Sequence, residues 1–252
     1  MTSIAGLFIW IWMLFTLQWK LEDIQNIKAL IVGQDPCENN GHGVVATCNY
    51  VARKYGVHSA MASIQAVRLV PQDKLVFVAP DFKTYRSVSA QIHSFMHDIT
   101  DRVESVALDE AYLDVTHNKL GEESAVKLAL DLQKRIRKEI GLNSSFGVSY
   151  NKFLAKMGSE YAKPFGRTVI LPSEAKQFLG MQKIEKFPGV GPKTQEQLHK
   201  LGVYTGADLQ QVDVLVLLNK FKKMGYILAQ HARGIDLNPV VTDSEVNRKS
   251  IG

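Results

Sequence analysis

The chain is 252 residues long, carries a formal net charge of +5 and is 46% hydrophobic. This length is enough for more than one domain with a sizeable core. A modest basic excess is compatible with nucleic-acid binding but does not demonstrate it. Only two cysteines are present, Cys37 and Cys48, which argues against a disulfide framework and against zinc held by paired cysteines. A reducing, cytoplasmic location fits this cysteine usage.

The first feature along the chain is an apolar segment at residues 4–19. It is shorter than the ~20 residues that a spanning helix needs. No positive charge precedes it and no small-residue cleavage site follows it, so a signal peptide fits poorly. A membrane-anchored protein is one alternative that this segment leaves open, and sedimentation with lipid vesicles would test it.

A short helix is predicted at residues 49–54. Its spacing presents Tyr50 and Arg53, three residues apart, on one face. Strands are predicted on both sides of it, at residues 30–33 and 74–78.

An amphipathic helix is predicted at residues 82–99. Apolar side chains recur along one stripe of this helix. The stripe consists of Tyr85, Val88, Ile92, Phe95, Met96 and Ile99.

Two adjacent carboxylates, Asp109 and Glu110, interrupt a run of β-forming residues at 105–116. The pattern predicts two short strands that meet at an acidic corner. Successive strand residues point to opposite faces, so both carboxylates can reach one ion only if the backbone turns or bulges there. Adjacent carboxylates repel each other unless a cation neutralises them, and hard oxygen ligands suit Mg²⁺. Taken alone, the pair is more typical of a solvated hairpin tip than of a metal site.

A second amphipathic helix is predicted at residues 122–140, closed by Gly141. Strands at residues 145–148 and 168–171 would complete a β-α-β-β-α-β arrangement that resembles a ferredoxin-like sheet. The predicted fold class is therefore α+β. The inward face of the helix is expected to carry Val126, Ala129, Leu130, Ile136 and Ile140. Lys134, Arg135, Arg137 and Lys138 are expected to form a solvated face.

After Pro172 the pattern changes to short helices and turns. Residues 187–191 predict the turn of a helix-hairpin-helix, whose glycines let the backbone approach a phosphate closely. A plain turn between two helices is the alternative. The chain then reaches a polar end at residues 248–252.

Four of these blocks resemble, in the same order, motifs of the Y-family DNA polymerases, the translesion enzymes, and most closely their DNA polymerase IV (DinB, UmuC-like) branch. They correspond to the fingers motif, the second carboxylate motif, the third palm motif and the thumb hairpin. The blocks are residues 45–57, 105–116, 147–166 and 187–194.

The resemblance implies a magnesium-dependent, template-directed DNA polymerase with two metal ions. It assigns Asp109 and Glu110 as catalytic metal ligands. Contacts to the incoming triphosphate are implied for Thr47, Tyr50, Arg53 and Lys163. DNA-backbone contacts are implied for Gly189, Val190, Gly191 and Lys193.

Further implications concern partners and domains. The partners are primer–template DNA, deoxynucleoside triphosphates and, in a complete protein, a sliding clamp; the chain is expected to be a cytoplasmic monomer without membrane contact. A further DNA-gripping domain, the little finger, follows the tether in this family and is not part of this sequence. The expected division is an aberrant first palm strand (1–20), a fingers-like region (21–79), the palm (80–171), the thumb (172–236) and the tether (237–252).

One expected motif is missing. Members of this family begin with a strand whose pattern is like Asp-Met-Asp-Ala-Phe-Tyr-Ala-Ala-Val-Glu, yet no acidic residue precedes Glu22 here. Translation of the neighbouring reading frame would supply the missing motif. Because Trp is encoded only by TGG and Met only by ATG, Trp10–Ile11 and Trp12–Met13 each force GAT, an Asp codon, and Trp19–Lys20 forces GAA, a Glu codon.

The codons between these also fit the family pattern. We therefore predict that the chain up to about Lys20 is translated from the wrong frame, and that the correct frame resumes before residues 29–33. A genuine apolar strand is the rival interpretation. Two functions follow as alternatives: a translesion polymerase, impaired in this chain by the missing aspartate, or a non-catalytic DNA-binding remnant of one.

Overall fold

A computed structural model describes residues 8–13, 28–242 and 244–245 of the chain. The chain forms two compact units, which are described one at a time. The first comprises residues 1–12, 93–135 and 144–252, and the second residues 13–92 and 136–143. Among the described residues, no helix is both long and apolar enough to cross a membrane.

The first unit is built on a mixed five-stranded sheet in the order β5-β6-β1-β7-β8. The strands β5 and β6 form an antiparallel hairpin, β1 pairs antiparallel with β6, and β7 pairs parallel with β8. The strand bounds are Phe8–Met13 for β1, Val103–Ala107 for β5, Glu110–Asp114 for β6, Ser144–Ser149 for β7 and Arg167–Ile170 for β8.

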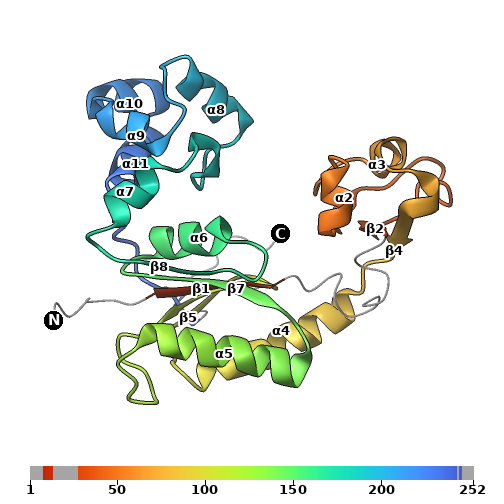
Figure 1. Ribbon diagram of the computed structural model, residues 1–252, viewed down its shortest axis with the longest axis horizontal. Coiled ribbons are helices and arrows are strands. Elements are labelled where there is room, and N and C mark those ends of the chain that lie inside the picture. Colours follow the sequence, from red (N-terminus) through yellow and green to blue (C-terminus); the bar gives the residue numbers. More distant parts are fainter. Residues whose placement is uncertain (1–7, 14–27, 243, 246–252) are drawn as a thin grey trace. The chain divides into compact units, whose positions relative to one another are not determined.

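Helices connect and cover this sheet. The helix α6 (Lys152–Tyr161) joins β7 to β8, as a parallel pair requires. Figure 1 shows α6 on one face of the sheet and α5 (Ala125–Ile140) on the other. Together with α4 (Phe82–His97), the chain order β1-α4-β5-β6-α5-β7 and the spatial order β5-β6-β1-β7 are those of a ferredoxin-like sheet. The predicted α+β class is confirmed, with β8 as an added edge strand.

The register of both amphipathic helices differs in part from the prediction. The helix α4 ends at His97, and its stripe from Val88 to Met96 is buried as expected, although Tyr85 is only half-buried. On α5, Ala129, Ile136 and Ile140 are buried as predicted, but Val126 and Leu130 are only half-buried. Leu128 and Leu132 take the inner positions instead.

The solvated face predicted on α5 is right for three of its four basic residues. Lys134, Arg137 and Lys138 are exposed. The fourth, Arg135, is half-buried: its guanidinium lies 4.0 Å from the centre of the Phe95 ring and donates to the Asp98 carboxylate at 2.7 Å.

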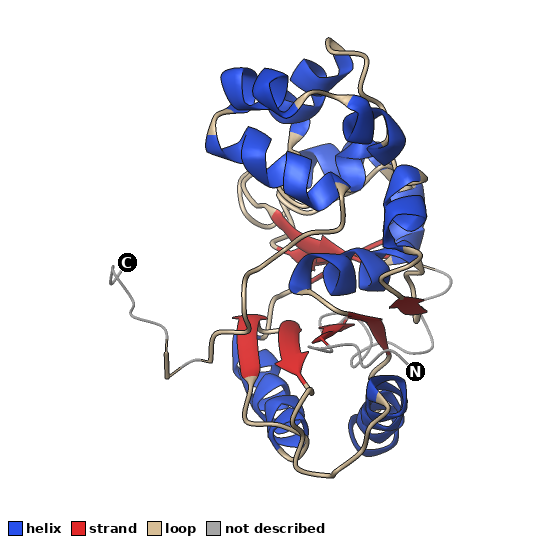
Figure 2. Cartoon of the chain, turned by 90° about the vertical axis from the view of Figure 1, so that its left-hand side faces the viewer, coloured by secondary structure: helices blue, strands red, loops and turns tan. Residues whose placement is uncertain are grey.

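Residues 171–242 contain helices and turns but no strand, as Figure 2 shows for this part of the chain. We call residues 175–232 the helical region. Its helices are α7 (Ala175–Gly180), η2 (Ile184–Lys186), α8 (Pro192–His199), α9 (Gly206–Gln211), α10 (Val214–Phe221) and α11 (Lys223–Ala232).

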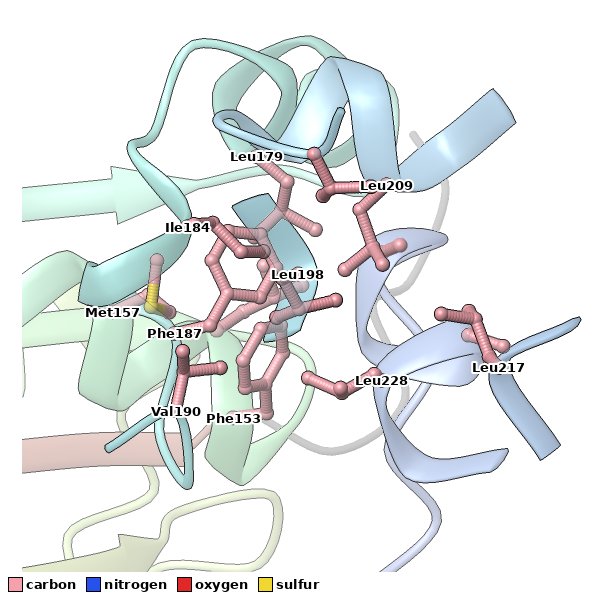
Figure 3. Packing of buried hydrophobic residues seen from close by; sticks show 14 of the residues in the cluster. Phe153, Met157, Leu179, Ile184, Phe187, Val190, Leu198, Leu209, Leu217 and Leu228 are labelled. Carbon is pink, nitrogen blue, oxygen red and sulfur yellow. The ribbon is translucent and has the colours of Figure 1, made fainter. Parts of the chain in front are cut away.

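One apolar core joins the helical region to α6. The Phe153 ring of α6 lies 5.9 Å from the Phe187 ring and stacks on His231 with ring centres 3.9 Å apart. Figure 3 shows Phe153 and Met157 pointing into the same cluster as leucines from the surrounding helices. Burial of this size holds the helical region and α6 together, since each fully buried large apolar side chain contributes about 1.5–3 kcal/mol.

The second unit is centred on a three-stranded sheet in the order β3-β2-β4. All five residues of the central strand β2 are buried, which fits a strand covered on both faces. Its strands are β2 (Ala29–Gly33), β3 (Val45–Cys48) and β4 (Leu75–Val78), and its helices are α2 (Tyr50–Lys54), α3 (Ser63–Leu69) and η1 (Gln72–Lys74).

Candidate functional site

Asp109 and Glu110 lie where β5 turns into β6. The residues between the strands form a tight turn, and the β5–β6 register shifts between Ser105 and Ala107. This irregularity is the turn or bulge predicted from two adjacent carboxylates. Both residues are partly shielded from solvent, so the pair is not a fully solvated hairpin tip. We call Asp109 and Glu110 the acidic corner.

The strand β1 runs directly beside this corner. Its antiparallel register pairs Trp12 with Glu110 and Trp10 with Tyr112. The positions that the neighbouring reading frame would fill with aspartate are thus the ladder partners of the acidic strand. The described residues contain no group of three His, Cys, Asp or Glu side chains placed to hold a metal ion.

Burial and repulsion change the titration of the corner. Burial, followed by the charge of Glu110, raises the pKa of Asp109 to about 6. Lys163 and Lys156 oppose this rise but do not cancel it. The raised pKa shows that the charged form of Asp109 is disfavoured beside Glu110. A cation that binds between the two carboxylates would stabilise that charged form.

Two lysines complete the set of charges. The Lys156 ammonium lies 3.2 Å from Glu110 Oε2 and donates to it. Lys163 pairs with Glu160, and burial lowers the pKa of Lys163 although both Glu160 and Glu110 act to raise it. The structure therefore brings Asp109, Glu110 and Lys163 within electrostatic reach of one another, and adds Lys156.

The helix α6 positions Lys156, and its own placement is tightly determined. Asn151 caps the helix by accepting from the Leu154 N–H at 2.9 Å. At Gly147 of β7, a Cβ would lie 2.0 Å from the Ala155 carbonyl oxygen, so only glycine lets the helix approach this closely. The height of Lys156 above the sheet is set by this contact.

The triphosphate candidates Thr47, Tyr50 and Arg53 lie together in the second unit. Thr47 is on β3, and the exposed Tyr50 and Arg53 share α2, as predicted. Asn49 fixes this helix, because its side-chain oxygen accepts from the N–H groups of Ala52 and Leu30 at 2.9 and 3.1 Å. The guanidinium of Arg53 is steadied by its bond to the Cys48 carbonyl at 3.3 Å.

The predicted hairpin turn lies in the helical region. Gly189 has φ +88°, a conformation that favours glycine, and the Val190 N–H closes the turn on the Phe187 carbonyl at 3.0 Å. Gly191 is the N-cap of α8 and nothing lies within 4 Å of the position that a Cβ would take there. Lys193 follows in the first turn, whereas Val190 is buried and anchors the turn.

Sequence reasoning missed Lys156 as a member of the site. The residue lies in the block at 147–166, and its spacing of four from Lys152 places both lysines on one face of a helix. That spacing could have indicated that the two lysines face the same side of the helix. It could not show which carboxylates they meet, because Glu104 and Glu110 come from the strands β5 and β6.

The two carboxylates of the acidic corner fit a divalent cation. Mg²⁺ is commonly bound through one or two carboxylates, with water and substrate phosphates as its other ligands. Asp109 and Glu110 supply hard oxygen donors, and their mutual repulsion is the electrostatic condition that favours a cation.

Comparisons with known proteins agree with this architecture. The impB/mucB/samB family matches residues 17–160, which is more than half of the chain, and the thumb domain of DNA polymerase-iota matches residues 185–236. The fold is thus of the polymerase type, with a helix-hairpin-helix thumb in the helical region. The chain belongs to the impB/mucB/samB family. The family match begins after the end of β1.

Relatives and solved structures point the same way. A DNA polymerase IV of Streptococcus pneumoniae is 52% identical over 225 residues, covering 89% of this chain and 63% of the relative. That of Streptococcus pyogenes is 50% identical over the same length, covering 61% of the relative. The chain therefore spans less than two thirds of the length of these relatives.

Among solved structures, DinB from Sulfolobus solfataricus superposes with a TM-score of 0.83 at 29% identity, over 94% of this chain and 69% of that one. An insertion ternary complex of Dbh DNA polymerase gives 0.80 at 28% identity, over 93% of this chain and 69% of that one. The resemblance to Y-family polymerases of the DNA polymerase IV branch is confirmed.

Proposed function

We propose that this chain carries the palm, fingers and thumb of a template-directed DNA polymerase of the translesion type, which acts in DNA damage bypass. The observation that carries the proposal is the acidic corner beside β1, with two lysines in electrostatic reach. The relatives named DNA polymerase IV support the same reaction.

Asp109 and Glu110 are the proposed metal ligands, and the family expectation is two Mg²⁺ ions. When bound, such ions activate the primer hydroxyl and neutralise the triphosphate. Lys163 adds a positive charge at the corner. Phosphoryl transfer depends mainly on positioning and charge neutralisation, so these residues act by holding the reacting groups in place.

The second unit is the proposed fingers region. Arg53 suits bidentate contact with phosphate oxygens, and its exposure on α2 leaves the guanidinium accessible. Tyr50 is on the same helix, and Thr47 is on β3, the strand that precedes it in the chain. Together with Lys163 they are the proposed contacts to the incoming deoxynucleoside triphosphate.

Primer–template DNA is the proposed macromolecular partner. The turn formed by Gly189, Val190 and Gly191 leads into α8, whose N-terminus has no side-chain cap, and Lys193 adds a positive charge. Non-specific phosphate contacts of this kind suit a polymerase that tracks along DNA. A cytoplasmic monomer, served in the complete protein by a sliding clamp, is the proposed setting.

We further propose that Phe8–Met13 occupies the place of the first palm strand but is read from the wrong frame. The ladder places positions 10 and 12 opposite Tyr112 and Glu110. A carboxylate at either position would complete the ligand set. As written, the chain is expected to extend primers poorly or not at all, and the DNA-binding remnant is then the better description of it.

Primer extension with purified variants tests the proposal. The double substitution Trp10→Asp and Trp12→Asp is expected to raise Mg²⁺-dependent extension at least about tenfold over the original chain, because a lost metal ligand is costly. Adding Asp109→Ala to that variant should abolish the gain. Extension by the original chain that survives Asp109→Ala would contradict the proposed role of the corner. Resequencing the DNA for residues 1–30 tests the frame shift independently.

A further inference from the structure

Among the described residues, the two carboxylates and two lysines at the acidic corner, together with Glu160, leave a net charge of −1 before any metal is added. Asp109 and Glu110 contribute two negative charges, and Lys156 and Lys163 contribute two positive charges that act on Asp109. Lys163 also interacts with Glu160, outside the corner. Lys156 is the lysine in direct contact with a corner carboxylate among the ion pairs of the described residues.

The contact between Lys156 and Glu110 is shielded. Their side chains keep only 26% and 19% of their surface exposed, so the pair interacts more strongly than an ion pair on the open surface. The backbone of α6 packs closely on the sheet, because Gly147 of β7 lies directly beneath Ala155. Any movement of the ammonium must therefore come from the flexible side chain of Lys156 itself.

A divalent cation at the corner would need the oxygens that this ammonium occupies. An ammonium donates hydrogen bonds to the same carboxylate lone pairs that a metal ion coordinates. Binding of a divalent cation would change the net charge of this cluster from −1 to +1. One resident positive charge then becomes surplus.

We propose that Lys156 is the resident counter-ion of the acidic corner: its ammonium takes the place of a metal cation at Glu110 and gives way when a divalent cation binds. This inference rests on the proposed function, because it assumes that the corner binds metal. Lys156 is a positioning residue in this scheme. It keeps Glu110 in place without metal and lowers the affinity for metal, so that binding stays reversible.

Lys152 provides a matched control on the same helix. It lies one turn before Lys156 and donates to both oxygens of Glu104 at 2.7 and 2.5 Å. Glu104 also accepts the Val241 N–H at 2.8 Å. The oxygens of Glu104 already accept these hydrogen bonds, so we expect no competition between a metal ion and Lys152 for this carboxylate.

The experiment is a Mn²⁺ titration of the full chain, followed by the EPR signal of the free ion. Mn²⁺ prefers the same hard oxygen ligands as Mg²⁺. Lys156→Met removes the charge and keeps the apolar stem, and is expected to tighten Mn²⁺ binding roughly fivefold or more. Lys156→Arg restores the charge and should return the affinity to that of the original chain. Lys152→Met and the exposed Lys200→Met should leave it unchanged.

Several results would overturn the inference. Mn²⁺ affinity that is unchanged or weaker in Lys156→Met, while Asp109→Asn weakens it, would refute the role of Lys156 and leave the metal site standing. If Lys156→Met and Lys200→Met raise the Mn²⁺ affinity equally, the effect comes only from the change in the net charge of the protein. Affinity that is insensitive to Asp109→Asn would remove the metal site itself, and the inference with it.

Discussion

Two lysine–carboxylate pairs lie one helical turn apart on α6, and they differ in how the lysine meets its carboxylate. In the first, Lys152 donates to both oxygens of Glu104, lies 4.8 Å from the centre of the Tyr112 ring and also reaches the Pro239 carbonyl. In the second, Lys156 reaches one oxygen of Glu110 at 3.2 Å.

The difference indicates that the Lys152–Glu104 pair stabilises the fold, whereas the Lys156–Glu110 pair belongs to the candidate metal site. The contacts of Glu104 and Lys152 tie β5, α6 and the segment after the helical region together, through residues 137 positions apart in the chain. Glu110 instead adjoins Asp109, whose pKa is raised in part by that neighbour. Perturbed pKa values of this kind cluster at functional sites, which favours a chemical role for the second pair.

The largest expected effect on stability comes from a substitution that forces α6 away from the sheet, because this would disturb both lysine–carboxylate pairs at once. In Gly147→Ala, the new Cβ would lie 2.0 Å from the Ala155 oxygen and 2.6 Å from the Ser159 nitrogen. Both are backbone atoms and cannot rotate away, so we expect a loss of at least about 3 kcal/mol in the free energy of unfolding. Urea denaturation followed by circular dichroism measures it.

Gly191→Ala is the control for that substitution. Nothing lies within 4 Å of its Cβ position and its φ is −83°. A loss below about 1 kcal/mol is expected there, since alanine is only a poorer N-cap than glycine. If both variants lose equal stability, close packing of α6 on β7 is not what holds the helix.

The second prediction compares the two pairs directly. Glu104→Ala leaves the shielded Lys152 ammonium and the Val241 N–H without their acceptor, so we expect about 3 kcal/mol of destabilisation. Glu110→Gln removes a charge that repels Asp109 and should cost less than about 1 kcal/mol. Chemical denaturation at neutral pH measures both.

Double-mutant cycles with Lys152→Met and Lys156→Met complete this comparison. The coupling energy of the first pair should exceed that of the second by more than about 1 kcal/mol. Equal coupling energies would mean that the second pair is as structural as the first, and the distinction drawn above would fail.

Sequence patterns predicted the local features of this site well. The acidic corner was predicted to bend because two neighbouring carboxylates on a regular strand point to opposite faces, and the β5–β6 register does shift there. The helix carrying Tyr50 and Arg53 was predicted from spacing, and Asn49 caps it. Such features depend on residues close together in the chain.

What sequence patterns missed depends on distant residues. The bond from Val241 to Glu104 joins two segments that no periodicity relates. On α5, the choice between Leu128 and Val126 for the inner face is set by the sheet and neighbouring helix, because adjacent apolar positions fit two overlapping stripes. The contact between Arg135 and Phe95 was missed for the same reason, since Phe95 belongs to α4.

The third prediction concerns an unsatisfied group that lies away from the corner. His231 stacks on Phe153, and its Nδ1 atom is buried with no hydrogen-bond partner among the described residues. Burial lowers the pKa of His231 below its usual 6.5, and Asp236 opposes this only in part. The unfolded chain therefore binds a proton at a higher pH than the folded chain does.

Stability should consequently fall as the pH drops below 6.5, the usual pKa of the unfolded residue. The slope contributed by this residue is at most about 1.4 kcal/mol per pH unit. His231→Phe keeps the stacked ring and should flatten the curve of unfolding free energy between pH 7 and 5 relative to the original chain, while matching it near pH 7.5. Parallel curves would show that His231 is protonated in the folded state.

The smallest expected effect tests a pair that is well bonded but open to solvent. Arg135 pairs with Asp98 at 2.7 Å and lies over the Phe95 ring, yet its side chain is 39% exposed. Exposed ion pairs and cation–π contacts contribute little, so Arg135→Met should cost about 0.5–1 kcal/mol. Lys134→Met, one position earlier on the exposed face, should stay within about 0.5 kcal/mol of the original chain. If Arg135→Met costs as much as Glu104→Ala, shielding from solvent is not what distinguishes the strong pair on α6, and bonding geometry alone would have to explain it.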